Sequence, residues 1–158
     1  MRRKNLEITD MTRIEKILRT NMVGRLGMCD DGAPYIVPMN YGCEINGDKI
    51  TLYFHSAFEG KKVDIMRQNP RICFETDTSY NLTGEGDVAC KYSYDYESFI
   101  GWGNIKILET VQERTYGLKV IMKHQTDRDF EIPENHLGKT LVIKLVLDEY
   151  TAKRSKGV

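Results

Sequence analysis

A hairpin pattern centred on Asn46 and Gly47 constrains the fold of this chain more than any other feature. Both residue types tolerate the positive φ that a two-residue hairpin turn requires, so the pair predicts a tight turn between two strands. The run that follows, residues 49–56, alternates apolar with more polar side chains, which is the period of a strand with one buried face. The chain is therefore expected to bury one face of an antiparallel sheet.

Five further strands are predicted from apolar or β-branched runs that are bounded by turn residues. They cover residues 22–28, 35–41, 71–76, 96–108 and 140–147. We expect the first two of these and residues 49–56 to form an antiparallel meander. Residues 77–95 are rich in Gly, Ser, Thr, Asp and Tyr, and this composition predicts a long loop.

Three short helices are predicted by apolar residues at helical spacing and by the residues at their ends. Thr110 and Glu113 have the spacing of a capping box, and Pro70 ends the preceding helix. The helices cover residues 10–21, 60–68 and about 110–125. With the six strands they predict a mainly β fold, a closed or partly closed antiparallel barrel with short helices at its ends.

Composition and length are those of an ordinary globular protein without a general affinity for polyanions. The chain has 158 residues, 41% hydrophobic and 29% charged, so we expect a single domain over residues 1–158. Because Lys and Arg balance Asp and Glu, the overall charge suits neither nucleic acid nor a membrane surface. The basic start lacks the apolar segment of a secretory signal, so a cytoplasmic location is expected. The basic tail, residues 151–158, is expected to fray.

Spacing argues against several common site types. The four cysteines, at positions 29, 43, 73 and 90, form no CxxC pair, so no metal site is predicted. The thiols are expected to be reduced and mostly buried. The GxG around Trp102 lies in a predicted strand and lacks the strand–turn–helix setting of a dinucleotide fingerprint. A Trp between two glycines instead allows close approach of a ring or of another chain.

The chemically most specific segment is the passage from a strand into a helix at residues 53–62, YFHSAFEGKK. A helix N-terminus offers unpaired backbone N–H groups and a partial positive charge. Ser56 can donate a further hydrogen bond, and Lys61 and Lys62 supply the full charges that a phosphate monoester requires. On spacing alone, an anion site and an ordinary helix start with two solvated lysines remain equal alternatives.

Two neighbouring features are ambiguous on local grounds. Pro38 cannot donate to a ladder, so it marks an edge against which a flat heterocycle can lie, although a plain edge strand is the simpler interpretation. His55 alternates away from the apolar side chains of its strand. It is a candidate flavin neighbour, acid–base group or axial metal ligand, although a hydrogen-bonded structural histidine is the simpler interpretation.

Taken together, these segments resemble the FMN-binding split β-barrels of the pyridoxamine 5'-phosphate oxidase-like family, and within it the nitroimidazole-resistance, nitroreductase-like subgroup. The order and spacing of the segments agree over roughly residues 6–147. The matching pieces are GRLGMCDDGAPYIVPMNYG (24–42), LYFHSAFEGKKVDIMRQNPRICFE (52–75) and YESFIGWGNIKIL (96–108).

The resemblance implies a six-stranded split β-barrel that forms a homodimer with FMN at the subunit interface. In the oxidase branch an Arg-Lys pair after the third strand grips the phosphate, and that pair aligns here with Lys61 and Lys62. Ser98 and Trp102 fall on the strand that reaches the flavin, either in the same subunit or from the other one. The remaining implied cofactor-binding residues are Val37, Pro38, Met39, Asn40, His55, Ser56, Ala57 and Gly60.

The C-terminal end departs from the family pattern. An oxidase of pyridoxamine phosphate ends in an Arg- and His-bearing motif after a Trp-containing strand, whereas residues 140–158 contain neither Trp nor His. Vitamin B6 oxidation is therefore not expected. The resemblance implies instead an FMN-dependent oxidoreductase that reduces small electrophiles such as nitro-aromatic compounds, with His55 as the candidate catalytic residue. The alternative is a non-catalytic flavin- or haem-binding protein of the same fold.

Overall fold

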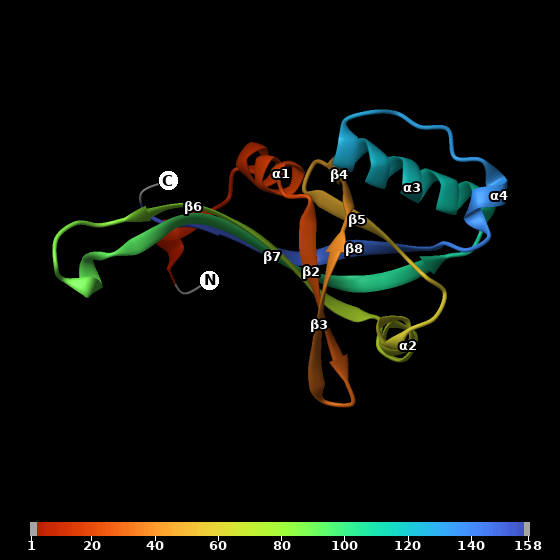
Figure 1. The fold of residues 1–158 in the computed structure, drawn as a ribbon, viewed down its shortest axis with the longest axis horizontal. Helices are drawn as coiled ribbons and strands as arrows, with labels where there is room; N and C mark the ends of the chain where they lie inside the picture. The colour runs from red at the N-terminus through yellow and green to blue at the C-terminus, as the bar shows by residue number, and fades with distance from the viewer. Residues whose placement is uncertain (1–2, 157–158) are drawn as a thin grey trace.

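The computed structural model describes residues 3–156, apart from the side chain of His136. Its centre is a curved antiparallel sheet in the order β3-β2-β6-β7-β8-β5-β4, with β1 paired to β8 (Figure 1). The strands are β1 (Glu7–Ile8), β2 (Val23–Asp30), β3 (Ala33–Asn40), β4 (Gly42–Asn46), β5 (Lys49–Ser56), β6 (Arg71–Thr83), β7 (Ser93–Leu108) and β8 (Leu141–Arg154). The helices are α1 (Met11–Thr20), α2 (Lys61–Gln68), α3 (Val111–Thr126) and α4 (Glu134–Leu137), with short 3-10 turns at Lys4–Leu6 and Ala89–Lys91.

The mainly β fold with short helices is confirmed, and the sheet is open, since β3 and β4 end its path. The expected six strands are wrong in number, because β1 and the five residues of β4 form strands of their own. The expected meander is also wrong, because β3 pairs with β2 whereas β5 pairs with β4 and β8. Between β3 and β4 the chain passes from one end of the sheet path to the other. Gly42, the first residue of β4, lies against α3, and an added Cβ there would lie 2.6 Å from the backbone nitrogen of Ile121.

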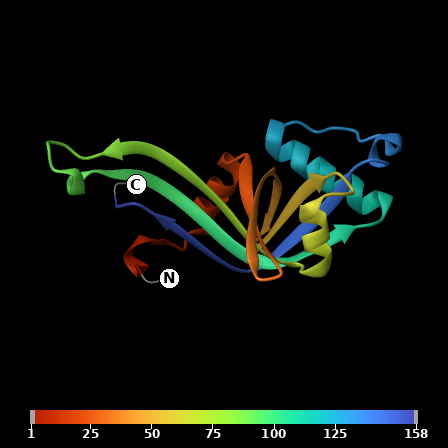
Figure 2. The same cartoon turned by 60° about the horizontal axis from the view of Figure 1, so that its bottom comes forward.

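The expected long loop over residues 77–95 is wrong. β6 and β7 continue as a paired ribbon to Thr83 and Ser93, and this ribbon projects from the rest of the molecule (Figure 2). Its Thr and Tyr residues favour strands, and the pair of Leu82 with Tyr94 keeps the ribbon together near its end. Positive φ at Gly84 begins the reversal at the tip.

The expected fraying of residues 151–158 is wrong for 151–154, which belong to β8; residues 157–158 lie outside the described part of the chain. The predicted helices are confirmed to within two residues at each end. Asp10 caps α1 by accepting from the backbone N–H of Thr12, and Thr110 and Glu113 form the predicted capping box of α3.

The apolar side chains form two clusters, one on each side of β5. The larger cluster lies inside the curved sheet and includes Leu52 and Phe54 of β5. The smaller cluster lies under α3 and includes Tyr53 from the opposite face of the same strand. Helix α2 packs beside β2, at the end of the sheet where the chain leaves β5. Within the described residues, no helix is long and apolar enough to cross a membrane.

Candidate functional site

The start of α2 is an open helix N-terminus. Its N-cap, Gly60, has φ 132° and ψ 156°, is exposed, and provides no side-chain cap. The backbone N–H groups of Val63 and Asp64 donate to the Gly60 carbonyl, at 2.8 and 3.2 Å. The first N–H groups of an α-helix have no intrahelical partner, so those of α2 can bind an anion.

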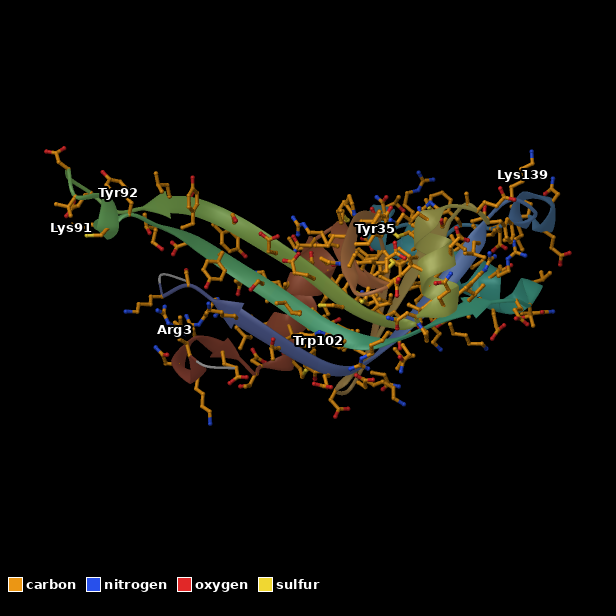
Figure 3. All side chains as sticks on the ribbon, turned by 90° about the horizontal axis from the view of Figure 1, so that it is seen from below. Arg3, Tyr35, Lys91, Tyr92, Trp102 and Lys139 are labelled. Carbon is orange, nitrogen blue, oxygen red and sulfur yellow. The ribbon has the colours of Figure 1, made fainter. Side chains whose placement is uncertain are left out.

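The two lysines at this helix start have different surroundings. Lys61 Nζ lies 2.9 Å from Asp30 Oδ2 and 5.2 Å from the centroid of the Tyr35 ring, and Figure 3 shows Tyr35 beside α2. The hydrogen bond and charge of Asp30 raise the pKa of Lys61. Lys62 is half-buried, and within the described residues no carboxylate lies within 4 Å of its Nζ. Lys62 therefore keeps its full charge for a ligand, whereas Lys61 shares its charge with Asp30.

Ser56 supplies the least expected observation at this site. It is the last residue of β5 and is buried, and its Oγ has no hydrogen-bond partner among the described residues. A buried hydroxyl without a partner is costly, so such groups call for a specific explanation. Residues 56–62 therefore contain an unpaired hydroxyl, a helix start without a side-chain cap and two lysines, and this donor set fits a phosphorylated ligand.

His55 points to the other face of β5 from Ser56. Its side chain is exposed, while Leu52 and Phe54 are buried in the larger cluster, so the predicted alternation is confirmed. Within the described residues, no side chain hydrogen-bonds to His55. A catalytic role for His55 therefore stays a prediction.

Four of the implied cofactor-binding residues lie on β3, an end strand of the sheet, as the proline predicts: Val37, Pro38, Met39 and Asn40. Val37 is half-buried and Met39 buried on the inner face, whereas Pro38 and Asn40 are exposed on the outer face. The Asn40 side-chain amide donates to Gln125 Oε1 at 3.3 Å, which ties the end of β3 to α3.

Ser98 and Trp102 are not brought to this site within one chain. Trp102 faces outward from β7 and pairs with Cys73 of β6. Cys73 pairs in turn with Gly27 of β2, and Gly27 pairs with Ile36 of β3, so three strand spacings separate Trp102 from Ile36. Three strand spacings correspond to about 14 Å, and Figure 3 shows Trp102 on the side of the sheet away from Tyr35. Trp102 therefore lies three strands from the β3 edge, on the opposite face of the sheet from Tyr35.

The glycines beside Trp102 have a reason within the chain. An added Cβ at Gly103 would lie 2.0 Å from the Val146 carbonyl oxygen, and one at Gly101 would lie 2.6 Å from the Leu147 side chain. Both glycines thus allow β8 of the same chain to approach closely, at the bulge in the β7–β8 ladder, and the expected approach of a ring or of another chain stays a prediction.

Two charged residues near this site were not predicted from the sequence. Asp30 reaches Lys61 from the end of β2. Arg114 of α3 places its guanidinium 5.6 Å from the centroid of the Phe58 ring, in the loop before α2, and donates to the carbonyls of Leu137 and Thr140. Both residues are distant in sequence from residues 56–62, and only the tertiary structure brings them there.

Other candidate sites are less well supported. The largest described cavity, about 660 Å³, lies between the start of α1 and the β6–β7 ribbon, away from the start of α2. Among the described side chains, no cluster of three or more His, Cys, Asp or Glu is placed to hold a metal ion. All four cysteines are free, and the expectation of burial is wrong for Cys29 and Cys90, which are exposed.

Comparison with known proteins places these features in a family context. The family model described as pyridoxamine 5'-phosphate oxidase matches residues 10–154. No curated protein matches the chain. Among solved structures, a protein named as a candidate 5-nitroimidazole antibiotic resistance protein from Bacteroides thetaiotaomicron is 31% identical, with a TM-score of 0.82. The match covers 94% of this chain and 86% of that one.

Two more distant structures share the fold. An FAD- and haem-binding protein from Mycobacterium smegmatis is 18% identical, with a TM-score of 0.78 over 96% of this chain and 74% of that one. An FAD-binding protein from Mesorhizobium loti is 23% identical, with a TM-score of 0.64 over 93% of this chain and 96% of that one.

Proposed function

The chain belongs to the pyridoxamine 5'-phosphate oxidase family, and from this premise we propose that it binds FMN and reduces small electrophiles such as nitro-aromatic compounds. The family is the one expected from the sequence. The name of the 31% identical relative supports a nitro-compound as the electrophile. The names of the two more distant neighbours support a flavin as the cofactor.

The observation that carries the proposal is the donor set at the start of α2. A phosphate monoester near charge −2 is best held by full positive charges together with backbone N–H groups at a helix N-terminus. Lys62 and the uncapped start of α2 would provide both, and the Ser56 hydroxyl, buried and without a partner four residues before Gly60, would add a further donor. Of the parts of a flavin nucleotide, the phosphate is the one that needs this arrangement.

The other residues take roles that follow from their positions. The backbone from Val37 to Asn40 runs along the open edge of the sheet and would support the ring edge. His55 and Ala57, both exposed at the end of β5, would lie alongside the ring and ribityl chain. When bound, the flavin itself supplies the electron and hydride transfer. His55 is the candidate proton donor.

A homodimer follows from the same proposal. Ser98 and Trp102 would reach the flavin of the partner subunit, since Trp102 lies three strands from the β3 edge within one chain. Exposed apolar side chains share the outer face of the sheet with Trp102, notably Ile36 at 66% exposure. Such a face favours association with another chain.

The absorption spectrum of the purified protein tests the proposal. We expect the visible and near-ultraviolet bands of an oxidised flavin, either as isolated or after addition of FMN. A protein that stays colourless with added FMN would contradict the proposal. A Soret band would instead support the haem-binding alternative, and flavin bands without turnover of nitro-aromatic compounds by reduced protein would support flavin binding alone.

A further inference from the structure

We propose that Asp30 sets the strength of phosphate binding at this site by pairing with Lys61 and withdrawing its charge from the ligand. The inference rests on the proposed function, and it concerns a residue that neither the sequence pattern nor the comparisons assign. It makes Asp30 a specificity-determining residue that weakens selection for a phosphorylated over an unphosphorylated flavin.

The geometry that carries the inference is the position of Lys61 Nζ. The ammonium group is held by two elements other than its own helix, by Asp30 Oδ2 at 2.9 Å from β2 and by the Tyr35 ring at 5.2 Å from β3. The side chains of Lys61 and Asp30 are 60% and 33% exposed. An exposed ion pair of this kind is weak, so an incoming phosphate competes with Asp30 for Lys61.

The charge balance gives the direction of the effect. Lys61 and Lys62 together would offer two positive charges, but the carboxylate of Asp30 cancels one of them at the helix start. A dianionic phosphate that shares Lys61 with Asp30 is also repelled by that carboxylate. At a separation of about 5 Å in water, screened at 0.15 M salt, removing this repulsion strengthens phosphate binding roughly fivefold.

The test is the substitution Asp30→Asn, which keeps the size and hydrogen-bonding capacity of the side chain and removes its charge. Dissociation constants for FMN and riboflavin are measured by flavin fluorescence. We expect FMN to bind about fivefold tighter, with a larger gain at low salt, and riboflavin to bind unchanged. Asp31→Asn is the matched control: Asp31 is exposed in the adjacent turn at φ 50°, which Asn tolerates, and neither ligand should respond.

A second substitution, Lys61→Ala, tests whether Asp30 competes with the phosphate for Lys61 or positions Lys61 to bind it. If Asp30 withdraws Lys61 from the ligand, Lys61→Ala should weaken FMN binding more in the Asp30→Asn background than in the unmodified protein. FMN binding that is unchanged or weaker in Asp30→Asn would overturn the inference, because Asp30 would then be inert or would position Lys61 for the phosphate. Failure of the proposed function is distinguishable, since the unmodified protein would then bind neither flavin.

Discussion

Replacing Ser56 by Ala should stabilise the flavin-free protein and at the same time weaken its binding of FMN. Ser56 Oγ is buried without a partner, and an unpaired buried hydroxyl costs about 1–3 kcal/mol. Ala removes this cost and leaves only a small void. We therefore expect the free energy of unfolding to rise by about 1 kcal/mol, which corresponds to roughly 3 °C in Tm. Lost hydrogen bonding to the ligand should weaken FMN binding about fivefold.

Ser155→Ala provides the matched control. Ser155 is 8% exposed, against 9% for Ser56, but its Oγ donates to Asp95 Oδ1 at 2.7 Å. Removing that donor should lower the free energy of unfolding by about 1–2 kcal/mol and leave FMN binding unchanged. Urea unfolding without flavin and fluorescence titration with FMN measure the two effects. If Ser56→Ala destabilised the flavin-free protein as much as Ser155→Ala, or left FMN affinity intact, the assignment of the hydroxyl to a ligand would be refuted.

Two further predictions concern the scaffold. Gly42→Ala should lower the free energy of unfolding by about 2 kcal/mol, because its Cβ would collide with the backbone of Ile121; Gly138→Ala, with open space around it, should be nearly neutral in the same thermal denaturation. Burial alone would raise the pKa of Glu97, but the hydrogen bonds that the Tyr80 hydroxyl and Arg13 donate to its carboxylate outweigh the burial. They hold the pKa of Glu97 below its usual 4.5. The stability from this carboxylate is present above pH 4.5 and lost as the pH falls through its lowered pKa. Glu97→Gln should therefore flatten the acid side of the stability profile in urea unfolding, and an unaltered profile would contradict this role.

Local patterns predicted the elements whose residues carry their own periodicity. The helices and most strands have apolar faces of the right period and residues such as Thr110 and Pro70 at their ends. β4 was not predicted because its five residues, between the end of β3 and the Asn46–Gly47 turn, show too little alternation. The β6–β7 ribbon was mistaken for a loop because its outer part has no buried face, so that both faces carry polar and Tyr residues.

The candidate site likewise has one part that the local sequence indicates and another that only the tertiary structure positions. Ser56, Gly60, Lys61 and Lys62 are nearly contiguous, so the strand-to-helix passage suggested an anion site there, and the family resemblance was needed to prefer it over an ordinary helix start. Asp30 joins that site only through the pairing of sheet and helix, and no local pattern links it to Lys61. Pairing order also determines that Trp102 lies three strands from β3, which no feature of its own segment could indicate.

The most direct test of FMN binding at α2 compares FMN with riboflavin in the double variant Lys61→Ala, Lys62→Ala. Since only FMN carries the phosphate, we expect the variant to lose most of its FMN affinity and to bind riboflavin as the unmodified protein does. The expected loss is at least tenfold, because the charge-assisted contacts of Lys62 and the shared charge of Lys61 both disappear. An equal loss for both flavins, or no loss of FMN binding, would contradict the assignment of the phosphate to the start of α2.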